Sequence, residues 1–282
     1  MTMQVRWTDP RLVFPLVAAA IVLALLFPVR QPIKPQQAVV QVYDYIERLP
    51  KGSAVMLAVD YDPQAKAELV PMTTAVLRHC LGRDLRVIGM TFWPQGTALG
   101  QSIFTAVAQE PQFRHKKAGS DYVYLGYKPG DMAQVITNMG ENLPNTFRQD
   151  YQNRPTTAMP IFQDVKSLKD VDYLLDLAAG NTPETWVQFG GDKYSVPMAV
   201  GCTAVMGPDM YVRLTAGQIN GLIAGLRGAA DYEVLLRRPD LGVAGMFAQS
   251  IIHVMIIVLV VVGNVAFLAT RRRKAREGER HG

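Results

Sequence analysis

Four side chains at the ends of two predicted strands could bind a ligand. Asp60 and Asp62 follow one short apolar run, and Tyr127 and Lys128 close another. Carboxylates near a lysine can bind a cation or carry out acid–base chemistry. The same residues also have structural explanations, because Asp62 followed by Pro63 is a good start for a helix and Lys128 can simply be hydrated. The pattern therefore predicts a ligand-binding crevice and assigns no catalytic residue.

The chain lacks the short motifs that mark the common enzyme classes. After the first predicted strand it reads Asp-Tyr-Asp-Pro, where a dinucleotide-binding protein has a Gly-x-Gly-x-x-Gly turn. A phosphate-binding loop, a His-Glu-x-x-His zinc motif and a Gly-x-Ser-x-Gly elbow are also absent from the sequence. We therefore expect no cofactor, and we favour a protein that is not an enzyme without deciding the point.

Cysteine usage does not indicate a metal site. The only two cysteines, Cys80 and Cys202, have no partner at the spacing that zinc sites use. They could form a disulfide if they lie outside the cytoplasm. Both lie among apolar residues, which favours two separate buried thiols. The sequence therefore predicts no bound metal.

A predicted α/β fold positions the candidate residues. Short apolar runs alternate with helical segments between residues 35 and 245, which is typical of a parallel sheet covered by helices on both faces. The pattern resembles the Rossmann-like or flavodoxin-like class, and we expect about five strands in the order 2-1-3-4-5. Pro197 indicates that the fifth strand lies at a sheet edge. The expected strands are residues 54–59, 85–93, 122–127, 171–178 and 196–203.

Two apolar segments flank this domain and predict membrane spans. Each is long enough to cross a bilayer, because about twenty residues at about 1.5 Å per residue cover the roughly 30 Å of its hydrocarbon core. The first segment could instead be a cleaved signal peptide, but no small-residue cleavage site follows it. The expected organisation is an N-terminus at 1–11, a first span at 12–30, a domain at 35–245, a second span at 247–270 and a basic tail at 271–282.

Charge decides the expected orientation in the membrane. Residues 271–282 contain six Lys or Arg and two Glu, whereas the rest of the chain contains 23 basic and 22 acidic residues. Because cytoplasmic flanks are rich in Lys and Arg, we expect both termini in the cytoplasm and the central domain in the periplasm or the extracellular space. The nearly neutral domain has no basic footprint for nucleic acid, so the expected partners are membrane lipid and protein.

Three regularly spaced glycines predict a close helix contact. Gly217, Gly221 and Gly225 recur every four residues in a predicted helix at residues 208–226, so they would share one face of that helix. Each glycine costs a helix up to about 1 kcal/mol relative to alanine, so a packing contact should compensate. The face could pack on the domain's own sheet or against a second subunit.

Three polar residues form a stripe in the second apolar segment. Gln249, His253 and Asn264 lie on one side of a helix at 3.6 residues per turn. Polar groups inside a bilayer prefer a protein partner to lipid, so we expect this stripe to contact the first span or another copy of the chain. A proton relay would need more ionisable groups than His253 alone.

Three functions remain compatible with these patterns. We prefer a non-catalytic, membrane-anchored scaffold or binding subunit of a membrane assembly, because packing surfaces are present and catalytic motifs are not. The first alternative is a small-ligand receptor or enzyme that uses the crevice around Asp60 and Lys128. The second alternative is an accessory subunit of a transporter, which would depend on His253.

Overall fold

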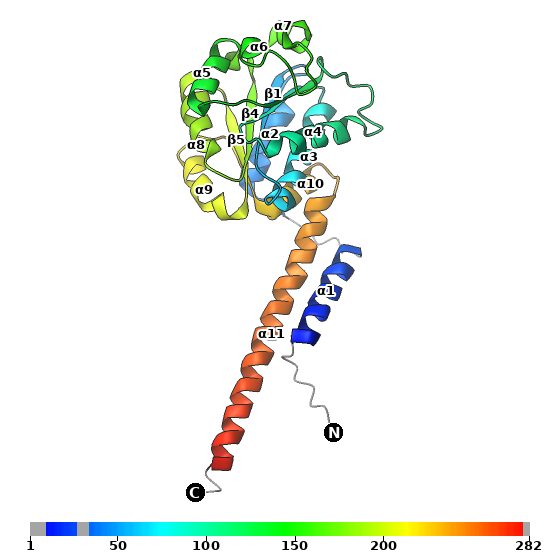
Figure 1. The fold of residues 1–282 in the computed structure, drawn as a ribbon, viewed down its shortest axis with the longest axis vertical. Coiled ribbons are helices and arrows are strands. Elements are labelled where there is room, and N and C mark those ends of the chain that lie inside the picture. Colours follow the sequence, from blue (N-terminus) through cyan, green and yellow to red (C-terminus); the bar gives the residue numbers. More distant parts are fainter. Residues whose placement is uncertain (1–9, 27–33, 279–282) are drawn as a thin grey trace. The chain divides into compact units, whose positions relative to one another are not determined.

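The computed structural model describes residues 10–26 and 34–278 of the 282-residue chain (Figure 1). Parts of the expected N-terminus, first span and basic tail fall on residues 1–9, 27–33 and 279–282, and lie outside the described residues. The chain divides into two compact units. One unit is Ile33–Val243, and the other combines Met1–Pro32 with Ala244–Gly282.

The unit Ile33–Val243 is built on a six-stranded, all-parallel sheet, which confirms the predicted α/β class. The sheet has the order β3-β2-β1-β4-β5-β6, so the predicted order 2-1-3-4-5 is wrong. The chain adds β2 and β3 on one side of β1 and then crosses to place β4 on the other side. The strands are β1 (Ala54–Asp60), β2 (Arg86–Thr91), β3 (Tyr122–Tyr127), β4 (Tyr173–Ala178), β5 (Met198–Cys202) and β6 (Leu222–Ala224).

The fifth strand is not an edge strand, contrary to the prediction from Pro197. β5 pairs with β4 on one side and with β6 on the other. Pro197 precedes β5, where its missing N–H removes no bond within the strand, and its carbonyl accepts the Leu174 N–H. Sequence reasoning missed β6 because it has only three residues and lies inside the segment 208–226 that was predicted to be helical.

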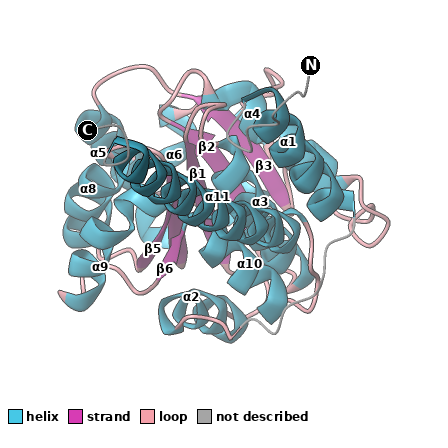
Figure 2. Cartoon of the chain, turned by 90° about the horizontal axis from the view of Figure 1, so that it is seen from below, coloured by secondary structure: helices cyan, strands magenta, loops and turns pink. Residues whose placement is uncertain are grey.

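Helices cover both faces of the sheet, as Figure 2 shows. A β1 strand buried at all seven positions requires such cover, because a central parallel strand faces apolar layers on both sides. One face carries α2 (Gln37–Arg48), α3 (Lys66–Gly82), α4 (Gly96–Ala108) and α10 (Gly225–Leu235). The other carries α5 (Met132–Glu141), α6 (Leu143–Thr146), α7 (Ile161–Asp164), α8 (Thr182–Trp186) and α9 (Gly207–Thr215). Short turns of helix are η1 (Thr156–Ala158), η2 (Leu168–Asp170), the π-type η3 (Val187–Asp192) and η4 (Ala204–Met206).

The two cysteines lie in different cores. Cys80, in α3, belongs to the core on one face of the sheet, and Cys202, in β5, belongs to the core on the opposite face. Both are free and buried, which confirms the prediction of two separate thiols.

Two apolar helices belong to the other unit in whole or in large part. α1 (Pro10–Leu26) has 17 residues and contains the apolar stretch Val13–Leu23. α11 (Leu241–Gly278) has 38 residues, and its segment Leu241–Ala269 has a mean hydropathy of 2.8. Among the described helices, only α11 is long and apolar enough to cross a membrane, and its most apolar part is not buried.

Candidate functional site

The strand order creates a switch point between β1 and β4. Open α/β sheets bind ligands beyond the carboxyl ends of the strands at such a point. Asp60 is the last residue of β1, and Asp176 in β4 lies in register with Ala58. Because side chains alternate along a strand, Asp60 and Asp176 project from the same face of the sheet. Sequence reasoning singled out Asp60 and missed Asp176, which sits inside an otherwise apolar strand.

The Asp60 carboxylate is fully buried and accepts three hydrogen bonds. The Phe92 N–H donates over 2.6 Å, the Thr91 hydroxyl over 3.2 Å and the Trp186 indole N–H over 3.4 Å. Burial raises the pKa of Asp60 to about 6, although these hydrogen bonds and Asp176 oppose that rise. The Phe92 and Trp186 rings pack on each other with centroids 5.5 Å apart. The neighbouring aromatic residues thus help to exclude water from the carboxylate.

Asp176 completes a buried carboxyl pair. Its Oδ2 accepts a hydrogen bond of 2.9 Å from the Thr182 hydroxyl, and its Oδ1 has no donor among the described side chains and backbone groups. Burial, followed by the nearby Asp60 carboxylate, raises the pKa of Asp176 well above its ordinary value. Two adjacent buried carboxyls cannot both ionise readily, so Asp176 retains a proton beside the Asp60 carboxylate. A pair with no exposed surface can organise the strand ends but cannot reach a substrate.

The other two charged candidates, Asp62 and Lys128, have local contacts of their own. Asp62 accepts the N–H groups of Gln64 and Ala65 over 2.9 and 3.3 Å, so it closes the turn that precedes α3. The Lys128 ammonium lies 5.6 Å from the centroid of the Phe147 ring. These contacts are the structural alternatives to ligand binding that the sequence left open.

Tyr127 ends β3 with 37% of its surface exposed. It shares no described cavity with Asp60, Asp62 or Lys128. Neither of the two cavities described on this domain is lined by any of the four predicted residues. That crevice remains a prediction without a described pocket.

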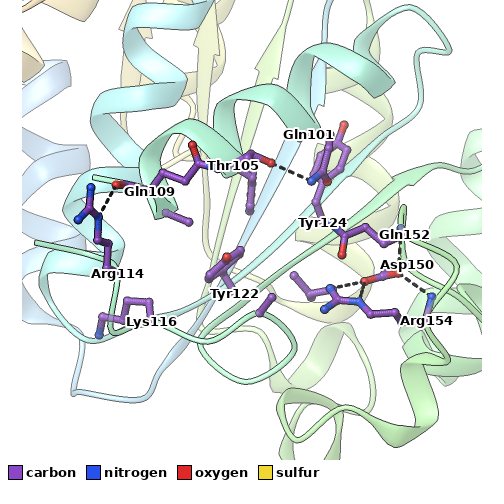
Figure 3. Close-up of a pocket in the computed structure, with 14 residues that line it drawn as sticks. Gln101, Thr105, Gln109, Arg114, Lys116, Tyr122, Tyr124, Asp150, Gln152 and Arg154 are labelled. Carbon is purple, nitrogen blue, oxygen red and sulfur yellow. Dashed lines mark hydrogen bonds and ion pairs between the residues drawn. The ribbon is translucent and has the colours of Figure 1, made fainter. Parts of the chain in front are cut away.

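A cavity of about 590 Å³ instead lies at the free edge of β3, on unit Ile33–Val243. Its walls come from α4, the loop that follows α4, β3 and the segment 150–154 (Figure 3). Its charged lining residues are Arg114, Lys116, Asp150 and Arg154. The volume falls within the roughly 300–1,000 Å³ that small-molecule sites occupy. No pattern in the sequence predicts this cavity, because its walls lie up to about fifty residues apart in the chain.

A second cavity of about 350 Å³ includes Arg78 and Arg238 in its lining. Both guanidinium groups are already committed to ion pairs. Arg78 binds Glu110 over 2.7 Å and Asp240 over 2.5 Å, and Arg238 binds Glu110 over 2.9 Å. This network links the end of α4 to α3 and to the segment before α11, so its evident role is structural.

The three predicted interface glycines do not share a helix face, so that part of the prediction is wrong. Gly217 follows α9 with a φ of +72°, Gly221 precedes β6, and Gly225 begins α10 with a φ of +63°. A Cβ on Gly221 would lie 2.5 Å from the Val42 side chain and 2.9 Å from its backbone nitrogen. Glycine at 221 therefore allows α2 to approach the sheet, which is packing within the domain.

The polar stripe of α11 is exposed in the structure. Gln249, His253 and Asn264 are all solvent-accessible on this helix. The Asn264 amide donates to the Val260 carbonyl over 2.9 Å, one turn earlier. Within the described chain no hydrogen bond joins Gln249 or His253 to another side chain. A contact between the stripe and another helix stays a prediction.

No group of three or more metal-ligating side chains forms a metal site within residues 10–26 and 34–278. Comparisons with protein-family models, with curated proteins and with solved structures give no match.

Proposed function

We propose that this chain is a non-catalytic, membrane-anchored α/β binding subunit of a membrane assembly. The observation that carries the proposal is the apolar, unburied surface of α11. Its apolar segment Leu241–Ala269 has 29 residues. At about 1.5 Å per residue it extends about 44 Å, more than the roughly 30 Å hydrocarbon core of a bilayer. Water contact with so much apolar surface is unfavourable by about 25 cal/mol per Å², so lipid is its natural environment.

The proposed topology has two spans. We place the first at residues 12–30, as the sequence predicts; the described helix α1 covers only part of this segment and, with 17 residues, is short for a spanning helix. The basic residues from Arg271 onward lie at the end of the second and favour a cytoplasmic C-terminus. Two spans then place both termini in the cytoplasm and Ile33–Val243 in the periplasm or the extracellular space.

A binding role agrees better with the site than a catalytic one. The carboxyl pair at the switch point has the altered pKa values that catalytic acids often show. Its side chains are nevertheless sealed from solvent, and their hydrogen bonds join β1, β4 and α8. The polar stripe of α11 is the proposed contact with a protein partner or with another copy of the chain.

Reporter fusions and alkaline extraction test the anchor. We expect the full chain to remain in carbonate-washed membranes, and we expect cytoplasmic signals from reporters at both termini. A charged variant, Ile257→Arg with Val261→Arg, should lose insertion of α11, because each arginine at the bilayer centre costs about 2.5–3.5 kcal/mol. The matched control is Ile257→Leu with Val261→Leu. Release of the unmodified chain by carbonate, or an external C-terminal reporter, would overturn the proposal.

Cysteine crosslinking tests the partner contact. Because Cys80 and Cys202 are buried, Gln249→Cys would supply the reactive thiol on α11. Val258→Cys is the control, because nine residues at 100° each place it on the opposite side of the helix. We expect the first variant to crosslink, to a second copy or to another membrane protein, and the control to crosslink poorly. Equal crosslinking of both variants, or none from either, would argue against the stripe as a contact surface.

A further inference from the structure

The cavity at the β3 edge has an excess of positive charge. Arg114, Lys116 and Arg154 line it, and Asp150 is its only acidic lining residue. Asp150 is almost fully buried and already accepts the N–H of Gln152 and the backbone and side-chain N–H groups of Arg154, over 2.6–2.9 Å. The carboxylate therefore has little capacity left for a ligand. It fixes the position of Arg154, whose guanidinium has more donors than Asp150 uses.

The two cations at the other end of the cavity are incompletely neutralised. The Lys116 ammonium binds Asp84 over 2.6 Å, but the same carboxylate binds Lys51 over 2.9 Å. One carboxylate thus faces two ammonium groups, and the pKa of Asp84 falls well below its usual range. Arg114 contacts the Gln109 carbonyl over 3.3 Å and, among the described residues, forms no ion pair. The Lys116 side chain is only 6% exposed, so an anion at this end would bind chiefly to the exposed Arg114 and would be attracted by the net positive charge around Lys116.

The middle of the cavity is polar and neutral. Gln101 donates to the Thr105 hydroxyl over 3.0 Å, which leaves its amide oxygen and the Thr105 hydrogen for other partners. Burial raises the pKa of Tyr122, so its phenol keeps a hydroxyl donor. Figure 3 shows Tyr122 between Arg114 and Lys116 on one side and Arg154 on the other. Amide and hydroxyl groups of this kind both donate to and accept from the hydroxyl groups of a sugar.

We propose that this cavity binds a sugar phosphate, with the phosphate between Arg114 and Lys116 and the hydroxylated body against Thr105, Gln101 and Tyr122. Arginine suits the phosphate because its planar fork can donate two parallel hydrogen bonds to it. Arg154 closes the far end and donates to ring or hydroxyl oxygens. The proposal does not depend on the membrane topology, because all of these residues lie in the unit Ile33–Val243.

Calorimetric titration of the full chain tests the site. The chain is kept in a polyoxyethylene detergent, because a glycoside detergent carries a competing sugar headgroup. The probes are glucose 6-phosphate, inorganic phosphate and glucose. We expect glucose 6-phosphate to bind at least about tenfold more tightly than either fragment, since it makes both sets of contacts at once. Phosphate that binds as tightly as glucose 6-phosphate, or no saturable binding of glucose 6-phosphate at millimolar concentration, would overturn the assignment.

Substitutions at Arg114 and at the nearby Lys117 distinguish a specific binding site from a general effect of positive charge. Arg114→Ala should weaken glucose 6-phosphate binding about tenfold or more and leave the weak binding of glucose unchanged. Lys117→Ala is the matched control, because Lys117 is exposed and does not line the cavity. The melting temperature of each variant shows that the domain remains folded. Equal losses in the two variants would mean that long-range charge, and not this cavity, attracts the phosphate.

Discussion

Replacing Asp60 by asparagine should change how the stability of the protein depends on pH. The folded-state pKa of Asp60 is about 6, whereas the ordinary value is 3.8. Between these values the folded state holds a proton that the unfolded chain has released. The stability that Asp60 contributes is therefore fully present below pH 3.8 and is lost as the pH rises through 6. At about 1.4 kcal/mol for each pH unit, the loss is about 3 kcal/mol.

The Asp60→Asn variant cannot undergo this titration, and it also removes the charge that helps to raise the pKa of Asp176, so the comparison with the unmodified chain measures the titration of the carboxyl pair. The experiment is urea unfolding of both proteins in mild detergent at pH 4 and pH 7.5, followed by tryptophan fluorescence. Trp186 donates to Asp60 and therefore reports on the site itself. At pH 4 the difference between the two free energies of unfolding measures the altered hydrogen bonds. Between pH 4 and pH 7.5 it should move by about 2 kcal/mol in favour of Asp60→Asn, because part of the full change has already occurred at pH 4.

A constant difference across this pH range would refute the reasoning, because it would mean that Asp60 ionises in the folded protein as it does in the unfolded chain. Asp176 provides a second comparison. Asp176→Asn keeps an acceptor for Thr182 and a neutral polar group beside Asp60, so it should change the stability at neutral pH by less than about 1 kcal/mol. Asp176→Ala leaves the Thr182 hydroxyl without its acceptor, beside a small buried cavity, and should cost about 3 kcal/mol. Equal effects of the two substitutions would contradict a proton held on Asp176.

Three further predictions concern the packing and charge of the domain. Gly221→Ala places a methyl group against Val42 and should lower the free energy of unfolding in urea by about 3 kcal/mol. Gly217→Ala has open space around it and should cost only about 1 kcal/mol, because of the positive φ at that position. Equal losses would contradict the steric explanation. Arg78→Met leaves two carboxylates without their shared cation and should lower the free energy of unfolding by about 2 kcal/mol, an effect that Arg78→Lys should partly restore. Burial lowers the pKa of His79, so the stability that neutral His79 contributes is fully present above pH 6.5 and is lost as the pH falls. His79→Gln should therefore flatten the decline in the free energy of unfolding below pH 6.5. An unchanged decline would mean that other groups cause it.

The sequence predicted the parts of the fold that depend on local pattern. Apolar runs of strand length identified β1 to β5, because a buried parallel strand needs apolar residues on both sides. Strand order could not be derived in this way, since it depends on where the crossover after β3 returns to the sheet. β6 was missed because three residues are too few to show a period, and a helical spacing of glycines concealed it.

The candidate site was predictable only in part, for a similar reason. Asp60 was identifiable because it ends a strand, but Asp176 lies two residues before the end of β4 and looks like an ordinary interruption of an apolar run. The cavity at β3 depends on four separate segments, and no spacing along the chain brings Arg114 near Arg154. A tertiary contact of this kind requires the fold before it can be recognised.

The segment that walls one side of the cavity also protects the sheet from pairing with other chains. The Tyr151 N–H binds the Tyr124 carbonyl over 3.0 Å, and Gln149 pairs with Pro155, so these residues form a strap along the free edge of β3. The opposite edge strand, β6, has only three residues, and short edge strands are poor templates for pairing. Molecules held in one membrane meet at a high effective concentration, which favours edge-to-edge aggregation. A sheet with one strapped edge and one short edge can be crowded on a membrane surface without forming such aggregates.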